Sequence, residues 1–138
     1  VYKGDLFIVG RYKDVIFQHG KNLYANDLES LALNVEGVNF GKIVIGGVFD
    51  EVRGNDRILA FIVGSPNKSS ALICQSIHKL FRESLGVTVS TFIPIRSNQI
   101  PKTSSGKIQR YKLISAYLKG MYDENISKME TLLKDSSH

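Results

Sequence analysis

The amino-acid sequence predicts a small α+β domain, in which helices cover a mostly antiparallel three-stranded sheet and a small N-terminal β-hairpin lobe comes first. Two observations predict this class. Short apolar runs rich in β-branched residues alternate with segments whose apolar residues recur every three or four positions. In addition, 138 residues of which 43% are hydrophobic suffice for one core, but not for a second full domain. Such an alternation is typical of helices packed on one small sheet.

The first part of the chain is predicted to form the hairpin lobe. Apolar residues at 1–2 and 6–9 flank the turn-like segment 3–5, which contains a glycine between two charged residues. A short β-rich run covers residues 15–17. Residues 18–22 are polar and predict a second turn, in which Gly20 takes a positive φ.

A first helix is predicted to begin at Asn26 or up to two residues earlier. Asn26 and Glu29 have the spacing of a capping box, in which two side chains bond the exposed N–H groups of the first helical turn. Gly37 is expected to end this helix. Its apolar residues recur at spacings of three and four: Leu28, Leu31, Ala32 and Val35.

Three strands are predicted for the sheet. Residues 42–49 and 57–63 are joined by the short acidic turn 50–56, which favours antiparallel pairing. Residues 87–95 are expected to form the third strand.

Two further helices are predicted between and after these strands. The first is amphipathic, begins at Ser69 or Ser70, and stops at Gly86. The second covers residues 111–118. Its apolar side chains are expected to face inward: Leu113, Ile114 and Tyr117.

The composition restricts the class of protein. Eighteen Lys and Arg against thirteen Asp and Glu give a net charge of +5, which suits an anionic small ligand as well as it suits nucleic acid. The single cysteine, Cys74, cannot form an internal disulfide and favours a reducing cytoplasm. No apolar run has the roughly 18–20 residues that a transmembrane helix needs, and the start has no signal-peptide pattern. The chain begins at Val1 without a methionine, which favours a piece of a longer protein.

Several kinds of catalytic site are excluded by their missing motifs. The sequence has no G-x-S-x-G and no G-x-G-x-x-G motif, and its three histidines are scattered. These histidines and the single cysteine do not have the spacing of metal ligands. Gly106 and Lys107 resemble the end of a phosphate-binding P-loop, but the first glycine is missing and Ile108 replaces the Ser or Thr that binds Mg²⁺.

The most distinctive stretch is the loop of residues 100–110. It contains Pro101, a run of three hydroxyl side chains, Gly106 and Lys107, and apolar residues flank it on both sides. The pattern predicts a polar, mobile loop that could carry one ammonium group toward a phosphate or carboxylate. On composition alone, a solvated surface lysine is the commoner interpretation.

Four segments in a fixed order resemble one known superfamily. Residues 10–16, 20–24 and 27–29, followed by 101–107, match the motifs of the small C-terminal domain of the acyl-adenylate-forming (AMP-binding) enzymes. These are the acyl-CoA synthetases, fatty acyl-AMP ligases and adenylation domains of peptide synthetases. The resemblance covers about residues 4–118, and the first motifs are most similar to those of fatty acyl-AMP ligases.

This resemblance implies a role for each matching residue. Lys107 corresponds to the catalytic lysine of adenylation, in which a carboxylate and ATP give acyl-AMP and pyrophosphate. Arg11 corresponds to the arginine that binds the nucleotide, and Lys13 to the hinge about which the domain rotates between half-reactions. The loop that would line the pantetheine channel after rotation consists of Gly20, Lys21 and Asn22. Glu29 and its helix are interpreted as structural.

The resemblance also implies three parts of the chain and their partners. Residues 1–17 are the hairpin lobe with the hinge, 18–118 a mobile lid domain, and 119–138 a tail that is partly helical or disordered. ATP and Mg²⁺ are expected to be bound mainly by an N-terminal adenylation domain outside this sequence. The acid is expected to be a fatty acid, and CoA or the phosphopantetheine of an acyl carrier protein is the expected acceptor. The isolated chain is expected to fold but to lack adenylation activity.

Two departures and one alternative function accompany this interpretation. His19 replaces the first of two glycines common before the Asn of the family motif, which affects the passage of a pantetheine arm, and Ala25 replaces a frequent proline. The alternative is a stand-alone basic α+β module that binds nucleic acid or an acidic partner. It lacks aromatic residues interleaved with basic ones, so nucleic acid is not expected as a partner.

Overall fold

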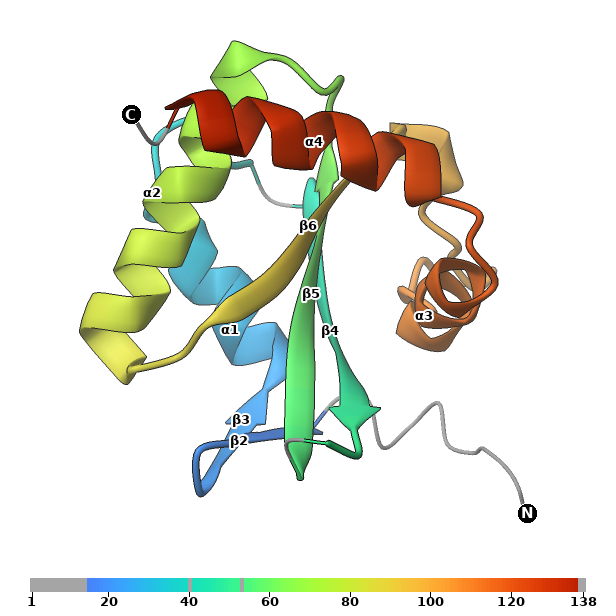
Figure 1. The fold of residues 1–138 in the computed structure, drawn as a ribbon. Helices are drawn as coiled ribbons and strands as arrows, with labels where there is room; N and C mark the ends of the chain where they lie inside the picture. Colours follow the sequence, from blue (N-terminus) through green and yellow to red (C-terminus); the bar gives the residue numbers. More distant parts are fainter. Residues whose placement is uncertain (1–14, 40, 53, 137–138) are drawn as a thin grey trace.

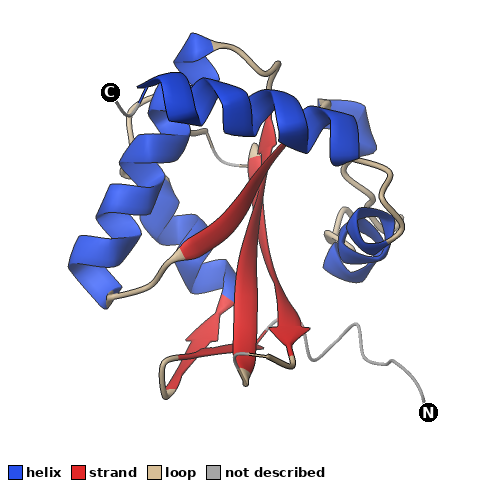
Figure 2. Ribbon diagram, viewed as in Figure 1, coloured by secondary structure: helices blue, strands red, loops and turns tan. Residues whose placement is uncertain are grey.

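The computed structural model describes residues 15–39, 41–52 and 54–136. Strands occupy the centre of the molecule and helices surround them (Figures 1 and 2). In chain order the elements are β2 (Val15–Gln18), β3 (Lys21–Tyr24), α1 (Ala25–Ala32), β4 (Ile43–Asp50), β5 (Asn55–Val63), α2 (Lys68–Leu85), β6 (Val89–Ile95), the 3-10 helix η2 (Ser97–Gln99), α3 (Arg110–Leu118) and α4 (Asp123–Ser136).

The predicted α+β class with a three-stranded sheet under helices is confirmed, but the sheet is mixed. Its strand order is β4-β5-β6, with β4 antiparallel and β6 parallel to β5. The tight turn between β4 and β5 reverses the chain, as the acidic turn predicted. Between β5 and β6 the chain instead passes through α2, and such a crossover returns the next strand in the same direction. The expectation of a mostly antiparallel sheet is therefore only half right.

A two-stranded hairpin precedes the sheet. Val15 pairs with Tyr24 and Gln18 with Lys21, so the turn consists of His19 and Gly20 alone. Both have positive φ, 54° and 77°, as a two-residue hairpin turn of this kind requires. The positive φ of Gly20 is confirmed, while the predicted turn was three residues too long. The hairpin predicted over residues 1–9 lies outside the described residues.

Helix α1 begins within the predicted range, at Ala25, but ends earlier than predicted. Tyr24 precedes its first residue, Ala25, and no side chain caps the first turn, so the predicted capping box is wrong. The side chains of Asn26 and Glu29 instead bond an arginine from another part of the chain. The helix ends at Ala32, and Gly37 lies in the turns that follow, with a φ of 97°.

Helix α2 is capped at both ends by residue types that favour helix termini. Its first residue, Lys68, lies one or two residues before the predicted start, and Asn67 before it accepts a hydrogen bond from Ser70 N. At its other end Gly86 is left-handed with a φ of 68°, as predicted. The N–H of Gly86 donates to Arg82 O at 3.0 Å, which is the 5→1 bond of an αL cap, and the N–H of Val87 donates to Phe81 O at 3.3 Å.

The sheet is covered on both faces by buried apolar side chains. One cluster joins the sheet to α1 and α2, and a second joins it to α3 through Leu113 and Ile114. Helix α4 contributes to both, with Met129 in the first cluster and Ile126 packed against the second, which also contains Tyr122 just before the helix. Burial of apolar area on both faces is the main stabilising contribution to such a small domain.

Helix α4 occupies most of the segment that was predicted to be a partly helical or disordered tail. Met129 is fully buried, and Asn125 Nδ2 donates to Pro94 O on β6 at 2.9 Å. The rings of Tyr122 and Phe61 meet edge to face with centroids 6.0 Å apart. The helix thus packs across the sheet end (Figure 1). Over the described residues, no helix is both long enough and apolar enough to span a membrane.

Candidate functional site

The loop that carries Lys107 is closed by its own hydrogen bonds. Lys102 and Ile108 form an antiparallel bridge at its base. The N–H of Thr103 donates to Lys107 O at 2.9 Å, and the N–H of Lys107 donates to Thr103 Oγ1 at 3.1 Å. Gly106 has a φ of 88°, a value that few other residues adopt readily, and this lets the chain reverse.

Both ends of this loop are fixed to the body of the domain. Ile100 is buried in the second core cluster and Ile108 packs against it. The N–H of Gln109 donates to Pro101 O at 2.9 Å, which ties the two arms together. The loop is therefore braced, and the reach of Lys107 comes from its long side chain rather than from slack in the backbone.

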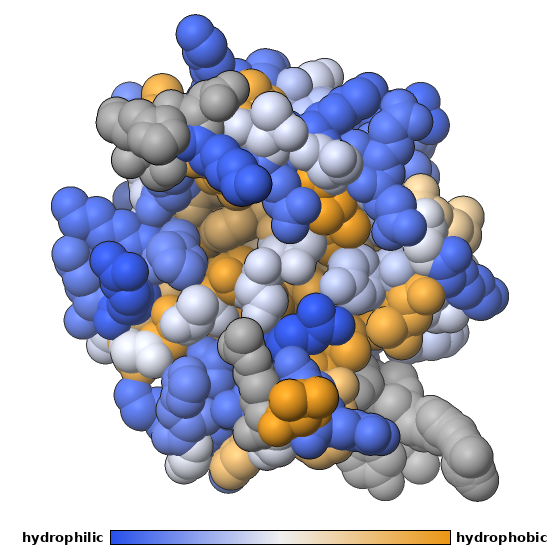
Figure 3. Space-filling model, viewed as in Figure 1, coloured by the Kyte–Doolittle hydropathy of each residue, from blue (hydrophilic) through white to orange (hydrophobic). Residues whose placement is uncertain are grey.

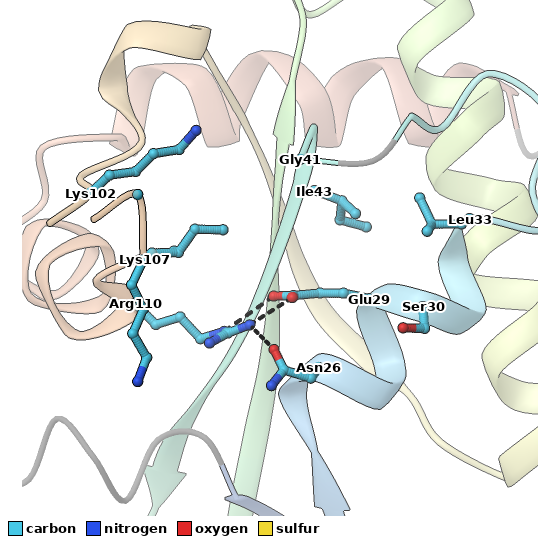
Figure 4. Close-up of a pocket in the computed structure, with 11 residues that line it drawn as sticks. Asn26, Glu29, Ser30, Leu33, Gly41, Ile43, Lys102, Lys107 and Arg110 are labelled. Carbon is cyan, nitrogen blue, oxygen red and sulfur yellow. Dashed lines mark hydrogen bonds and ion pairs between the residues drawn. The ribbon is translucent and has the colours of Figure 1, made fainter. Parts of the chain in front are cut away.

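Lys107 lies at a hollow of about 540 Å³ between this loop, α1 and the start of β4 (Figure 4). The hollow has an apolar part, formed by Leu33, Ile43 and Ile108. The remaining lining residues are Asn26, Glu29, Ser30, Gly41, Lys102, Gly106, Lys107 and Arg110.

One side of the hollow is built by a bidentate ion pair. Arg110 Nη2 lies 2.6 Å from Glu29 Oε1, and Arg110 Nε lies 3.1 Å from Glu29 Oε2. Arg110 Nη2 also donates to Asn26 Oδ1 at 2.7 Å (Figure 4). The two charged side chains are only 10% and 16% exposed. Little water competes for these bonds, so the pair is well placed to hold α1 against the start of α3.

The same pair occupies the open edge of the sheet at Ile45. Among the strands of residues 15–136 that the structure describes, β4 pairs with β5 on one side only. The N–H of Ile45 donates to Glu29 Oε2 at 2.8 Å, and Ile45 O accepts from Arg110 Nε at 3.2 Å. The two side chains therefore supply the partners that a neighbouring strand would have given, which satisfies backbone groups that are costly to leave unpaired.

The charge balance of the hollow favours an anion. Within the described lining, Lys102, Lys107 and Arg110 contribute three positive charges, and Glu29 is the single carboxylate. Glu29 is already engaged by Arg110. Among the described residues, no hydrogen bond or ion pair holds the ammonium group of Lys107, and its side chain is exposed. This lysine is therefore available for a negatively charged group outside the described part of the chain.

The other predicted site residues that the structure describes do not line this hollow. Arg11 and Lys13 lie outside the described residues. Gly20, Lys21 and Asn22 belong to the β2–β3 hairpin, where Lys21 Nζ donates to Leu85 O at the C-terminal end of α2. A cation at that end of a helix is favourable, because unpaired carbonyl groups collect there.

The sequence interpretation missed the role of Arg110 and gave Glu29 only a structural one. A usable signal was present in α1. Its polar residues that line the hollow, with Leu33 after the helix end, recur at spacings of three, four and seven: Asn26, Glu29, Ser30 and Leu33. That periodicity marks one helix face, opposite to the apolar face on which the helix was predicted.

The titratable groups with shifted pKa values lie elsewhere. Cys74 lies beneath a groove between α2, β6 and α4, and its burial raises the pKa of its thiol to about 12. Burial, and then the nearby charge of Arg82, lower the pKa of His78. In Figure 3 polar side chains cover α2 and α4, and apolar ones gather between them. No group of three or more His, Cys, Asp or Glu side chains that could hold a metal ion occurs among the described residues.

Comparison with known proteins finds no matching family model, but it finds individual relatives. A putative acyl-CoA synthetase of Caulobacter vibrioides is 32% identical over 122 residues, which are 88% of this chain and 21% of that protein. The medium-chain-fatty-acid–[acyl-carrier-protein] ligase JamA of Moorena producens is 28% identical over 138 residues, covering 97% of this chain and 23% of the ligase.

The fold matches solved structures of the same kind of enzyme. The McyG A-PCP structure with phenylalanyl-adenylate superimposes with a TM-score of 0.81 and 25% identity, covering 90% of this chain and 20% of that one. The chain thus spans about a fifth of the length of the proteins that it matches. Sequence and fold agree, and the chain belongs to the acyl-adenylate-forming (AMP-binding) enzyme superfamily.

Proposed function

We propose that this chain is the mobile C-terminal lid domain of an ATP-dependent acyl-adenylating ligase. The observation that carries the proposal is Lys107, an exposed lysine on a braced loop, whose ammonium group no described residue engages. A lysine held in this way is suited to reach an active site on another domain. The match to about a fifth of each relative supports the same conclusion, because most of such an enzyme lies outside this chain.

Lys107 would act in the first half-reaction. A carboxylate oxygen attacks the α-phosphorus of ATP, the bond from that phosphorus to the bridging oxygen of pyrophosphate breaks, and acyl-AMP forms. Two anions must approach each other in this step, and negative charge collects on the phosphoryl oxygens. An ammonium group placed between them stabilises that arrangement more than it stabilises the separated reactants.

The remaining ligands of ATP would come from the rest of the enzyme. Hard cations such as Mg²⁺ need several oxygen ligands, and the described residues offer no acidic cluster for one. Glu29, the one carboxylate among the described residues that line the hollow, is bonded to Arg110 and to Ile45. We therefore assign Mg²⁺ to the ATP phosphates and the larger domain, and nucleotide binding within this chain to Arg11.

In the second half-reaction the domain would rotate about Lys13 and present the β2–β3 hairpin. Gly20, Lys21 and Asn22 would then line the channel for a pantetheine thiol, carried by CoA or by a carrier protein. One relative is named for the first acceptor and another for the second. A fatty acid is the proposed substrate class, since a relative acts on medium-chain fatty acids by name. The proposed compartment is the cytoplasm.

The test compares the two half-reactions in the full-length enzyme. Lys107→Ala should lower carboxylate-dependent pyrophosphate exchange by about 100-fold or more, the usual cost of removing a charge that stabilises a transition state. Thioester formation from supplied acyl-AMP should be unchanged. Lys112→Ala is the matched control, because Lys112 is an exposed lysine on α3 that does not line the hollow. Equal loss of both half-reactions in Lys107→Ala would refute the proposed role.

A further inference from the structure

The connection between Lys107 and the sheet runs through one arginine. Arg110 stands three residues after Lys107 and is the first residue of α3. Its guanidinium bonds two oxygens of Glu29, the backbone oxygen of Ile45, and the amide oxygen of Asn26. These three partner residues belong to α1 and β4 and stand 65, 81 and 84 positions before Arg110 in the sequence.

This arrangement fixes an orientation as well as a position. A guanidinium is planar, so two parallel bonds to a carboxylate set the plane of the group. Glu29 is held in turn, because its Oε2 accepts the N–H of Ile45 at 2.8 Å. The Nε–H of Arg110 lies next to the backbone, which leaves few ways for the start of α3 to tilt.

The orientation of α3 reaches Lys107 through a short and stiff path. Gln109, next to Arg110, bonds Pro101 on the opposite arm of the loop, and Ile108 bridges Lys102. Lys107 N and O both bond Thr103. A tilt at Arg110 would therefore move the whole loop as a unit and displace the base of the Lys107 side chain.

We propose that Glu29 and Arg110 are positioning residues for adenylation: their bidentate pair on the open edge of β4 sets the direction from which Lys107 reaches the reacting phosphate. This inference rests on the proposed function. It adds two residues, Glu29 and Arg110, that contribute to adenylation by positioning Lys107. Neither needs to touch a substrate.

The experiment uses the full-length enzyme and double mutants. Arg110→Lys keeps the positive charge but loses the two parallel N–H donors of the guanidinium. Glu29→Gln keeps the size of the side chain but loses its negative charge. Each should lower kcat for pyrophosphate exchange by about 10- to 100-fold, as expected for a displacement of about 1 Å of a reacting group. The KM for ATP and thioester formation from supplied acyl-AMP should stay near wild type. Arg57→Lys is the matched control, since Arg57 forms a longer pair of 3.9 Å with Asp50 on the same sheet.

The decisive comparison repeats Arg110→Lys in a Lys107→Ala background. If Arg110 acts through the lysine, the second substitution costs nothing further there. A loss of the same size in both backgrounds, or no loss in the wild-type background, would overturn the positioning role while leaving Lys107 catalytic. An adenylation rate unchanged by Lys107→Ala alone would instead overturn the proposed function, so the two failures are distinguishable. A fall in thioester formation in Arg110→Lys would mean loss of fold and would also overturn the inference.

Discussion

Gln18 and Thr88, which lie seventy residues apart in the sequence, pair as if they were neighbours in a sheet. The N–H of Thr88 donates to Gln18 Oε1 at 2.9 Å, and Gln18 Nε2 donates to Thr88 O at 3.3 Å and to Asp56 O at 3.2 Å. Gln18 is only 5% exposed. This single side chain therefore joins the β2–β3 hairpin to β5 and to the residue just before β6.

Gln18→Ala should destabilise the chain by about 2–3 kcal/mol, because it removes three hydrogen bonds and leaves backbone groups near the core unpaired. Urea unfolding of the isolated chain, followed by circular dichroism, measures the change. Gln75→Ala on α2 is the control and should change the free energy of unfolding by less than about 0.5 kcal/mol. Equal effects of both substitutions would show that the hairpin is not held by Gln18.

Met129→Ala should cost about 3 kcal/mol in the same assay, since it empties a fully buried position between α4 and the sheet. The chain supplies its own control in Met121, which is 70% exposed, and Met121→Ala should be nearly neutral. If Met129→Ala were equally neutral, α4 would not contribute to the stability of the domain.

Cys74 should react slowly with thiol reagents while the protein is folded. Only the thiolate is nucleophilic, the side chain is fully buried, and burial raises its pKa from 9.0 to about 12. At pH 8 and at pH 9.5 alike, labelling of the folded chain should therefore stay far slower than labelling of the urea-unfolded chain. Mass spectrometry after iodoacetamide treatment measures both. Rapid, stoichiometric labelling of the native protein would contradict the burial of this thiol.

Lys13→Pro should have the opposite effect to Lys107→Ala in the full-length enzyme. Proline fixes φ and removes an N–H, so a hinge at this position could no longer rotate. Adenylation should continue, while thioester formation from supplied acyl-AMP should fall. Lys13→Ala keeps the backbone free and should retain both half-reactions. Unimpaired thioester formation in Lys13→Pro would place the hinge at another residue.

Local patterns predicted the elements of this fold better than their partners. Gly86 and the apolar spacing of α2 identified that helix and its end, because both signals lie within a few consecutive residues. The parallel pairing of β5 with β6 was missed, since strand direction depends on how α2 crosses the sheet. Asn26 and Glu29 looked like a capping box, whereas their partner, Arg110, stands 84 and 81 residues away.

The candidate site shows the same limit. The motif around Lys107 and its polar loop could be found from the sequence, and the loop was expected to be mobile. Its hydrogen bonds through Thr103 instead make it a braced hairpin. The hollow itself could not be predicted, because it is formed by segments that meet only after α1, β4 and α3 have packed.

The most direct test of the central claim is the ratio of the two half-reaction rates in full-length Lys107→Ala, measured on one enzyme preparation. If Lys107 acts in adenylation alone, pyrophosphate exchange falls by about 100-fold or more while thioester formation from supplied acyl-AMP stays at the wild-type rate. A ratio equal to that of the wild-type enzyme would contradict it.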